Sequence, residues 1–381
     1  MKIFHISDVH IGMKFQRYPE ALRNSLIEAR FTAIESAVLL ADAENCDVLA
    51  ITGDIFESIK ATKKEVERVC EIMKRFNGGA IWVLPGNHDY YDASLQLWKW
   101  FEASMPDAVM LLNENKTYDF EIGDQSVEVF AVPCDNKHSA VNHLDWIKEL
   151  NLGEALLGEP LLKKRRLRIL LAHGAIKDIS PDLSNMYYPM TLSELAGLNM
   201  DLSLLGHTHV PYPNKWETQT DRIFNAGTPE PDGLNYRYEG SGWLIELSDS
   251  GAASAKRMRL GTYQFFDLQV SVSDGFDLEA LLKPLDKTRM KNAVVRISLD
   301  GFLDKDVFET RHEVYEKVRS EVAYLEINDD AVRAKFTKDT LIENFPEGSL
   351  PYKLLETFIE EDDLATAHLA FEIMHEVMQH D

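Results

Sequence analysis

The stretch VLPGNHDYYD, residues 83–92, ends an apolar run with a Pro-Gly turn and then places Asn87, His88 and Asp89 in succession. The apolar run, AIWVL at residues 80–84, is typical of a buried β-strand. A turn needs proline and glycine, but it does not need three polar side chains that bind metals or phosphates. The trio therefore indicates a functional site at the end of a strand.

Polar side chains follow four further apolar runs in the same way. They are Asp8 and His10 after KIFHIS, Asp54 after DVLAIT, His173 after RILLA, and His207 and His209 after LSLLG. In open α/β sheets, ligand sites form outside the carboxyl ends of the strands. Because five of the twelve histidines lie in these turns, we expect the side chains to converge on one rim of a sheet.

The first two-thirds of the chain alternates short apolar runs with helix patterns. The helix patterns cover residues 20–44, 63–76 and 94–103, and each lies between two strand-like runs. This alternation predicts an α/β fold with a buried sheet. Glycines next to Asp54, Asn87, His173 and His207 would let the backbone turn sharply at the strand ends.

The pattern changes near Gly261. Residues 262–327 read as β-α-β-α-β, which is enough for a small second domain. We therefore predict three parts, at 1–260, 261–336 and 337–381. The last part, a tail, carries two amphipathic helix patterns, one with Leu350, Leu354, Leu355 and Phe358 and the other with Leu364, Phe371, Met374 and Met378.

Composition restricts the partners and the location. The net charge of −23 speaks against a broad surface for polyanions, because phosphate contacts come from Lys and Arg. A basic cluster comprises Lys163, Lys164, Arg165, Arg166 and Arg168. It is either a solvated loop before a strand or an edge that contacts phosphates.

The three cysteines, Cys46, Cys70 and Cys134, have no paired spacing, which fits a reducing compartment. The N-terminus lacks the apolar core of a signal peptide, and no apolar window is long enough to span a bilayer. We therefore expect a cytoplasmic protein without a membrane partner.

The residue types at the strand ends favour divalent metals. Asp, His and Asn without Cys suit Mn²⁺, Fe²⁺ or Zn²⁺. The number of candidate ligands exceeds what one ion with open positions needs, and it fits two ions that share a carboxylate. Two ions about 3.5–4 Å apart clamp a phosphoryl group and lower the pKa of a bridging water.

The motifs DxH, GD, GNHD, an isolated His-Gly and GHxH, in that order, resemble those of the calcineurin-like metallophosphoesterases. The resemblance covers residues 1–260. It implies a four-layer αββα sandwich, followed here by a smaller α+β capping domain and the helical tail. It also implies two divalent metal ions, and we expect Mn²⁺, with Fe²⁺ or Zn²⁺ as alternatives.

The resemblance assigns a role to each residue at the strand ends. Asp8, His10 and His209 would hold one metal, and Asn87, His173 and His207 would hold the other, with Asp54 as the bridge. A hydroxide between the metals would attack the phosphorus. His88 would face the scissile phosphate as an acid or a stabiliser of the transition state, and Asp89 would orient His88.

Within this family, ISDVHIG, a helix with Arg30 and Ala33, and DVLAITGDIF look like the SbcD/Mre-type DNA repair nucleases. That resemblance implies cleavage of DNA, a tail that binds an SMC-like ATPase of the SbcC type, and a homodimer. The alternative for the tail is that its apolar stripes dock on the protein's own body. Some relatives carry a histidine where this chain has Glu57. Glu57 and the acidity keep a second interpretation open, a phosphoesterase for a small nucleotide or a lipid-linked phosphate.

Overall fold

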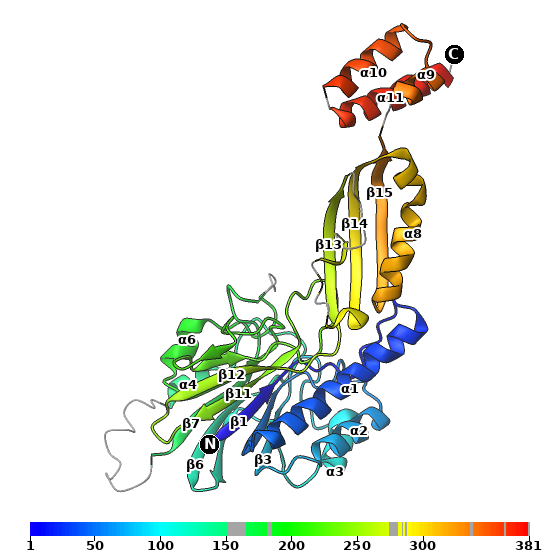
Figure 1. Ribbon diagram of the computed structural model, residues 1–381. Coiled ribbons are helices and arrows are strands. Elements are labelled where there is room, and N and C mark those ends of the chain that lie inside the picture. The colour runs from blue at the N-terminus through cyan, green and yellow to red at the C-terminus, as the bar shows by residue number, and fades with distance from the viewer. Residues whose placement is uncertain are drawn as a thin grey trace. The chain divides into compact units, whose positions relative to one another are not determined.

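The computed structural model of the chain describes residues 1–150, 165–180, 185–273, 281–283, 285, 288–335, 338–361 and 363–379. The chain divides into two compact units, Met1–Phe265 and Phe266–Asp381 (Figure 1). The three-part division with boundaries after residues 260 and 336 stays a prediction.

Seven strands of the first unit form one sheet, in the order β4-β3-β2-β1-β11-β12-β9. The strands β1 to β4 pair in parallel, whereas β11 pairs antiparallel to β1. Parallel neighbours require crossover connections, and three helices supply them. The bounds are β1 (Lys2–Ile6), α1 (Glu20–Ala43), β2 (Val48–Thr52), α2 (Lys63–Met73), β3 (Ala80–Leu84), α3 (Gln96–Ser104), β4 (Val109–Leu111), β9 (Glu217–Thr218), β11 (Ser241–Leu247) and β12 (Ala253–Arg259).

Five strands form the second sheet, in the order β10-β8-β7-β6-β5. All neighbours pair in parallel except β5 and β6, which form an antiparallel hairpin. The bounds are β5 (Lys116–Ile122), β6 (Gln125–Val132), α4 (Asp145–Glu149), β7 (Leu167–His173), α6 (Leu192–Gly197), β8 (Leu202–Gly206) and β10 (Ile223–Asn225).

Along each strand of this unit, side chains point alternately into two different hydrophobic cores. In β2, Val48 and Ala50 face the space between the sheets, while Leu49 and Ile51 face the helices. Successive side chains of a strand point to opposite faces, so strands that are apolar throughout are buried on both sides. The core between the sheets takes Trp82 from one sheet and Ile169 from the other.

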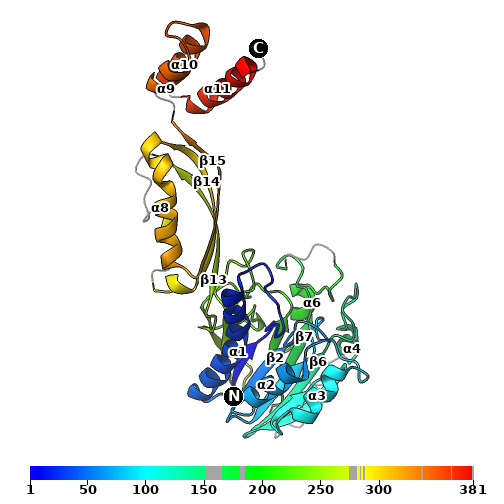
Figure 2. The ribbon, with the colours of Figure 1, turned by 90° about the vertical axis from the view of Figure 1, so that its right-hand side faces the viewer.

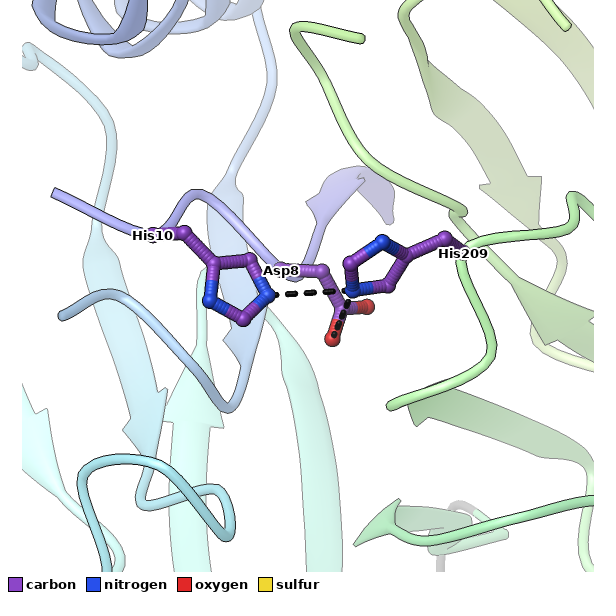
Figure 3. A group of neighbouring side chains, drawn as sticks. All are labelled: Asp8, His10 and His209. Carbon is purple, nitrogen blue, oxygen red and sulfur yellow. Dashed lines mark hydrogen bonds and ion pairs between the residues drawn. The ribbon is translucent and has the colours of Figure 1, made fainter. Parts of the chain in front are cut away.

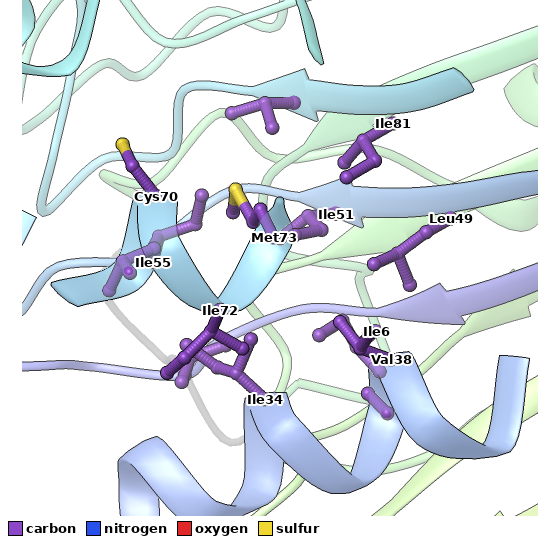
Figure 4. Close-up of a cluster of buried hydrophobic side chains, with 14 of the residues drawn as sticks. Ile6, Ile34, Val38, Leu49, Ile51, Ile55, Cys70, Ile72, Met73 and Ile81 are labelled. Carbon is purple, nitrogen blue, oxygen red and sulfur yellow. The ribbon is translucent and has the colours of Figure 1, made fainter. Parts of the chain in front are cut away.

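Helices cover the outer face of each sheet. Figure 4 shows Ile34 and Val38 of α1 and Ile72 of α2 against the strand residues Leu49 and Ile51. The helices α4 and α6 contribute to a separate core on the outer face of the second sheet. The predicted αββα sandwich is therefore confirmed, with α1 to α3 on the outer face of the first sheet (Figure 2).

The second unit contains a three-stranded sheet, in the order β13-β14-β15, with the helix α8 packed on it. Most of residues 277–285, the first helical segment of the β-α-β-α-β pattern predicted for 262–327, lies outside the described residues. The described part of the tail forms three helices rather than the two expected, since a further helix, α9 (Lys338–Asn344), precedes Leu350. The bounds are β13 (Gln264–Val272), η1 (Met290–Asn292), β14 (Ala293–Leu303), α8 (Lys305–Glu321), β15 (Tyr324–Ala334), α9 (Lys338–Asn344), α10 (Leu350–Glu360) and α11 (Leu364–Gln379).

Only part of each predicted apolar stripe in the tail is buried. Leu355 is fully buried, whereas Leu350 is 80% exposed and Leu354 is 40% exposed. The side chain of Met378 lies outside the described residues. In the described part of the chain, we find no helix with both the length and the apolar character that a membrane span requires.

Candidate metal centre

The carboxyl ends of five strands bring the predicted site residues of the first unit together. Because these strands are parallel within each sheet, their carboxyl ends lie at the same edge. Asp8 and His10 follow β1, Asp54 follows β2, Asn87, His88 and Asp89 follow β3, His173 ends β7, and His207 and His209 follow β8. The site therefore draws on both sheets.

Asp8, His10 and His209 form the first group of candidate ligands. The Nε2 atoms of His10 and His209 lie 3.0 Å apart, and the Nε2 atom of His209 lies 3.8 Å from Asp8 Oδ1. Figure 3 shows the two rings turned toward each other beside the carboxylate of Asp8. Ring nitrogens that converge in this way present their lone pairs to a common point.

Asn87, His173 and His207 form the second group. The Oδ1 atom of Asn87 lies 3.0 Å from His173 Nε2 and 2.9 Å from His207 Nδ1. The Nδ2 atom of Asn87 is buried and has no hydrogen-bond partner. Buried polar groups in structural roles are normally hydrogen-bonded. Because the NH₂ group of Asn87 is unpaired, the oxygen is the functional end of this amide, which fits a metal ligand better than a structural residue.

Asp54 lies between the two groups. Its Oδ2 atom is 3.3 Å from His173 Nε2 and 3.9 Å from His10 Nε2. The carboxylate is 1% exposed, and its Oδ1 atom accepts a hydrogen bond of 2.8 Å from the backbone N–H of His88. This position is the one that a carboxylate shared by two metal ions would need.

The donor set fits a pair of divalent ions. Imidazole nitrogens, carboxylate oxygens and one amide oxygen converge here without a thiolate, which is the chemistry of Mn²⁺, Fe²⁺ or Zn²⁺ sites. Four of the candidate ligands also have backbone φ angles in the left-handed region. These residues are Asp8 (56°), His10 (54°), Asp54 (54°) and His207 (91°). Such strain costs about 1–3 kcal/mol at each residue and clusters at functional sites.

Comparison with known proteins identifies the first unit. Residues 1–211 match the Calcineurin-like phosphoesterase family. The chain belongs to this family. It is a metal-dependent phosphoesterase, because the family binds two divalent metals and the chain has the His and Asp groups to hold them.

Solved structures to which the chain is similar include TT1561 of Thermus thermophilus, with 14% sequence identity and a TM-score of 0.39; the match covers 68% of this chain and 98% of that one. A dimetal phosphatase from Danio rerio has 10% identity and a TM-score of 0.39, covering 68% and 99%. Yfce, a phosphoesterase from E. coli, has 14% identity and a TM-score of 0.27, covering 68% and 100%.

His88 lies at the edge of the phosphoesterase centre, and its side chain is 28% exposed. Its Nδ1 atom donates to the backbone carbonyl of Glu57 at 2.9 Å. Its ring meets that of His10 edge-on, with the centroids 4.9 Å apart. Because Nδ1 carries the proton of this hydrogen bond, Nε2 is the atom left to act on a substrate.

Asp89 is fully buried and does not contact the side chain of His88. Its carboxylate accepts hydrogen bonds from the backbone N–H groups of Gly86, Asp54 and Phe56, at 2.7, 3.2 and 3.0 Å. These hydrogen bonds hold the backbone of the turn that carries His88, and the role of Asp89 in orienting the His88 ring stays a prediction. The ring of His88 contacts His10 and the backbone carbonyl of Glu57, and sequence reasoning did not give Glu57 this role.

Two carboxylates missed as site residues stand behind histidines of the first group. Asp232 Oδ2 lies 2.7 Å from His209 Nδ1, and Glu57 Oε2 lies 2.8 Å from His10 Nδ1. Glu57 is only 33% exposed, so it does not begin a solvated loop. For Asp232, the local signal is a PEPDG turn, which by itself indicates only a loop.

The buried charges perturb one another. Burial lowers the pKa of His209 and raises that of Asp232, but their mutual hydrogen bond and charge outweigh it. The pKa of His209 therefore rises to about 9, and that of Asp232 falls well below its usual range. Burial also lowers the pKa of His173, but the charge and the hydrogen bond of Asp54 outweigh burial and raise this pKa to about 9. Burial, together with the charge of Asp54, raises the pKa of Asp89 to about 7. A metal would displace protons from such histidines.

The described residues of the basic cluster all form ion pairs. Arg165 pairs with Asp201, and Arg166 pairs with Asp119 at 3.1 Å. Arg168 lies 3.4 Å from Glu128, near the amino end of β7, whereas His173 ends that strand. Five residues of strand separate them by roughly 16 Å, so these arginines do not border the metal centre. Lys163 and Lys164 lie outside the described residues.

Gly206 allows the two sheets to approach each other at the site. A Cβ atom there would lie 1.9 Å from the carbonyl oxygen of Thr52 and 2.8 Å from His173 Nδ1. We expect Gly206→Ala to lower the free energy of unfolding by about 1–3 kcal/mol, because the backbone must move. Denaturant unfolding measures this. Gly197→Ala is the control, since its Cβ would meet nothing within 4 Å. Equal stability of both variants would contradict the prediction.

Proposed function

We propose that the chain is a two-metal phosphodiesterase that cleaves DNA, like the SbcD/Mre-type nucleases whose motifs it resembles. Asp8, His10 and His209 would hold one ion, Asn87, His173 and His207 the other, and Asp54 both. Two ions bound here would act as Lewis acids on phosphate oxygens and lower the pKa of a water molecule. His88, whose Nδ1 is held by Glu57, would donate from Nε2 to the phosphate or to the leaving oxygen.

The observation that carries this proposal is a cleft of about 600 Å³ beside the candidate ligands His207 and His209. Tyrosines line it, and the ring of Tyr187 lies 5.0 Å from that of His207. Arg237 also lines the cleft and is exposed. Aromatic rings stack on nucleic-acid bases without regard to sequence, and an arginine suits a backbone phosphate. A cleft of this size accommodates one nucleotide.

The second unit supports the partner proposals. Large apolar side chains are exposed on the tail, where such patches mark binding surfaces for proteins. They include Ile342, Leu350, Leu369, Ile373 and Val377. We propose that this surface binds an SMC-like ATPase of the SbcC type and that the preceding domain caps the substrate. A homodimer and a cytoplasmic location remain proposals, and the free, buried state of all three cysteines agrees with the latter.

A second candidate is a phosphoesterase for a small nucleotide or a lipid-linked phosphate. The net charge of −23 and the ion pairs of Arg165, Arg166 and Arg168 favour it, because they leave little basic surface for a long polyanion. The carboxylate of Glu57, 3.9 Å from His88 Nδ1, adds a negative charge close to the expected path of the substrate.

Cleavage of end-labelled single- and double-stranded DNA in Mn²⁺ tests the proposal. We expect fragments with the wild-type protein, release of fragments slowed by about 10²–10⁴-fold with His88→Ala, and no fragments with chelated protein. A nucleotide, a lipid diphosphate and bis-p-nitrophenyl phosphate are assayed in parallel. Turnover of the nucleotide or the lipid without any action on DNA would replace the first candidate with the second.

A further inference from the structure

The backbone that carries Asp8 and His10 is strained, and hydrogen bonds hold it in place. Both residues have left-handed φ angles, 56° and 54°, and Val9 lies between them. The backbone N–H groups of Asp8 and His10 donate to the carbonyls of Gly53 and Asp54, at 3.1 and 2.9 Å. Because such angles persist only where the surroundings impose them, the partners of this segment decide where its two candidate ligands stand.

Arg30 of α1 supplies a charged partner for the segment. The residue is 1% exposed, and its Nη1 atom donates to the backbone carbonyl of Val9 at 2.6 Å. The guanidinium carbon lies 5.4 Å from the centre of the Phe15 ring. Within the described part of the chain, Nε and Nη2 have no hydrogen-bond partner, so the carbonyl of Val9 is the directed contact of this buried cation. A charge-assisted hydrogen bond is roughly twice as strong as a neutral one.

Thr228 holds the same segment from the loop that follows β10. Its buried hydroxyl lies 2.8 Å from the backbone carbonyl oxygens of Asp8 and Glu230 and shares its proton between them. In the same loop, Asp232 Oδ2 lies 2.7 Å from His209 Nδ1. One short loop therefore contacts the backbone of Asp8 and the ring of His209, two of the three candidate ligands of the first group.

Electrostatic attraction connects this loop with Arg30. The guanidinium lies within electrostatic reach of Asp232, Glu230 and Glu57. Glu57 Oε2 lies 2.8 Å from His10 Nδ1, so the carboxylates behind both histidines of the first group face the same buried cation. Because buried charges are screened little by salt, this attraction helps to hold the two carboxylates beside their rings.

We propose that Arg30 and Thr228 are positioning residues of the metal centre, which clamp the Asp8–His10 backbone and so preorganise the first metal position. Neither residue is a ligand, and each acts through the segment that it holds. A site whose ligands stand in place before the ion arrives loses less binding free energy to ordering them. The inference rests on the two-metal centre of the proposed function and not on DNA as the substrate.

Calorimetric titration of metal-free, full-length protein with Mn²⁺ tests the inference without any substrate. Arg30→Met removes the charge and the donor but keeps a long side chain, and Thr228→Val removes only the hydroxyl. We expect each to weaken binding at one of the two metal positions by about 10–100-fold, the usual effect of losing an outer partner of a ligand. Arg30→Lys, which retains a charged donor, should restore most of the affinity. Arg68→Met is the matched control, because Arg68 stacks on Phe31 and pairs with Glu28.

Two results would overturn the inference. One is wild-type affinity for Mn²⁺ in a folded variant, which would confine the residue concerned to a role in the fold. The other is tighter binding by Arg30→Met, because the guanidinium would then act on the ion only by repulsion. Thermal melting shows whether each variant is folded, and Thr228→Val decides the matter if Arg30→Met does not fold.

The visible spectrum of bound Co²⁺ gives a second measurement on the same proteins. It reports the geometry of the ligands, so it should change in Arg30→Met and Thr228→Val but not in Arg68→Met. A residue that only stabilises the fold would leave the spectrum of the folded protein unchanged. Inactivity on DNA would leave the titration unchanged, so the two proposals fail separately.

Discussion

Replacing His88 with alanine is expected to slow hydrolysis of a DNA phosphodiester by about 10²–10⁴-fold while both metal ions stay bound. The ring of His88 lies beside the candidate ligands, but His88 belongs to neither of the two ligand groups. Its Nδ1 is tied to the carbonyl of Glu57, so Nε2 is free for a phosphate oxygen or for the leaving oxygen. The loss should appear in kcat, because a proton transferred in the transition state contributes little to binding of the substrate.

The leaving group distinguishes the two roles of His88. An alkoxide leaves DNA only with a proton, whereas p-nitrophenolate leaves without one. If His88 acts as an acid, the variant should lose far less activity on bis-p-nitrophenyl phosphate than on DNA. If His88 instead stabilises the transition state, its removal should slow hydrolysis of both substrates equally. Metal content is measured for the same samples. His143→Ala is the histidine control, because His143 contacts Asn115 and Tyr188 instead of the candidate ligands. Wild-type rates on both substrates in the His88 variant would refute any catalytic role.

Replacing Asp54 with asparagine is expected to have the largest effect of any single change at the site. Its Oδ2 atom is near His10 of one group and His173 of the other, and it is 1% exposed. The substitution keeps the size of the side chain but removes the charge that both metal positions would share. Loss of an outer partner of a ligand already costs about 10–100-fold in metal affinity, so loss of this carboxylate should exceed that range.

Metal analysis after gel filtration should find fewer than two ions per chain of the Asp54→Asn protein. Hydrolysis should fall by more than about 10³-fold, since removal of a single oxyanion contact costs about 10²–10³. Asp221→Asn serves as the control for charge, because Asp221 contacts Thr218 and Lys215 instead of the centre. Two retained ions together with near-normal turnover would show that Asp54 does not bridge.

Much of the sandwich could be predicted from local pattern. The apolar runs at β1, β2, β3, β7 and β8 are continuous because both faces of each strand are buried, and each run ends in a polar residue. The antiparallel pairing of β11 with β1 could not be predicted in the same way. It joins Lys2 to Glu246, which lie near opposite ends of the first unit in the sequence. Strand pairing at such separation depends on how the sheets close, which no local window contains.

The strain at the site was also invisible in the sequence. Glycines beside the candidate ligands suggested that glycine would absorb the sharp turns. The left-handed φ angles are found at Asp8, His10, Asp54 and His207 themselves, as well as at Gly53. A residue type tells how easily a conformation is adopted, but the packing around it decides whether that conformation is imposed.

The sequence by itself determined which residues are the candidates for the chemistry. Periodicity along the strands is a local property, and so is the placement of Asp, Asn and His directly after them. Only the tertiary structure decided what supports those residues. Glu57 lies 47 positions from His10 and Asp232 lies 23 from His209, in loops that read as ordinary turns. Their carboxylates meet the rings because two sheets, packed face to face, bring the ends of distant strands to one edge.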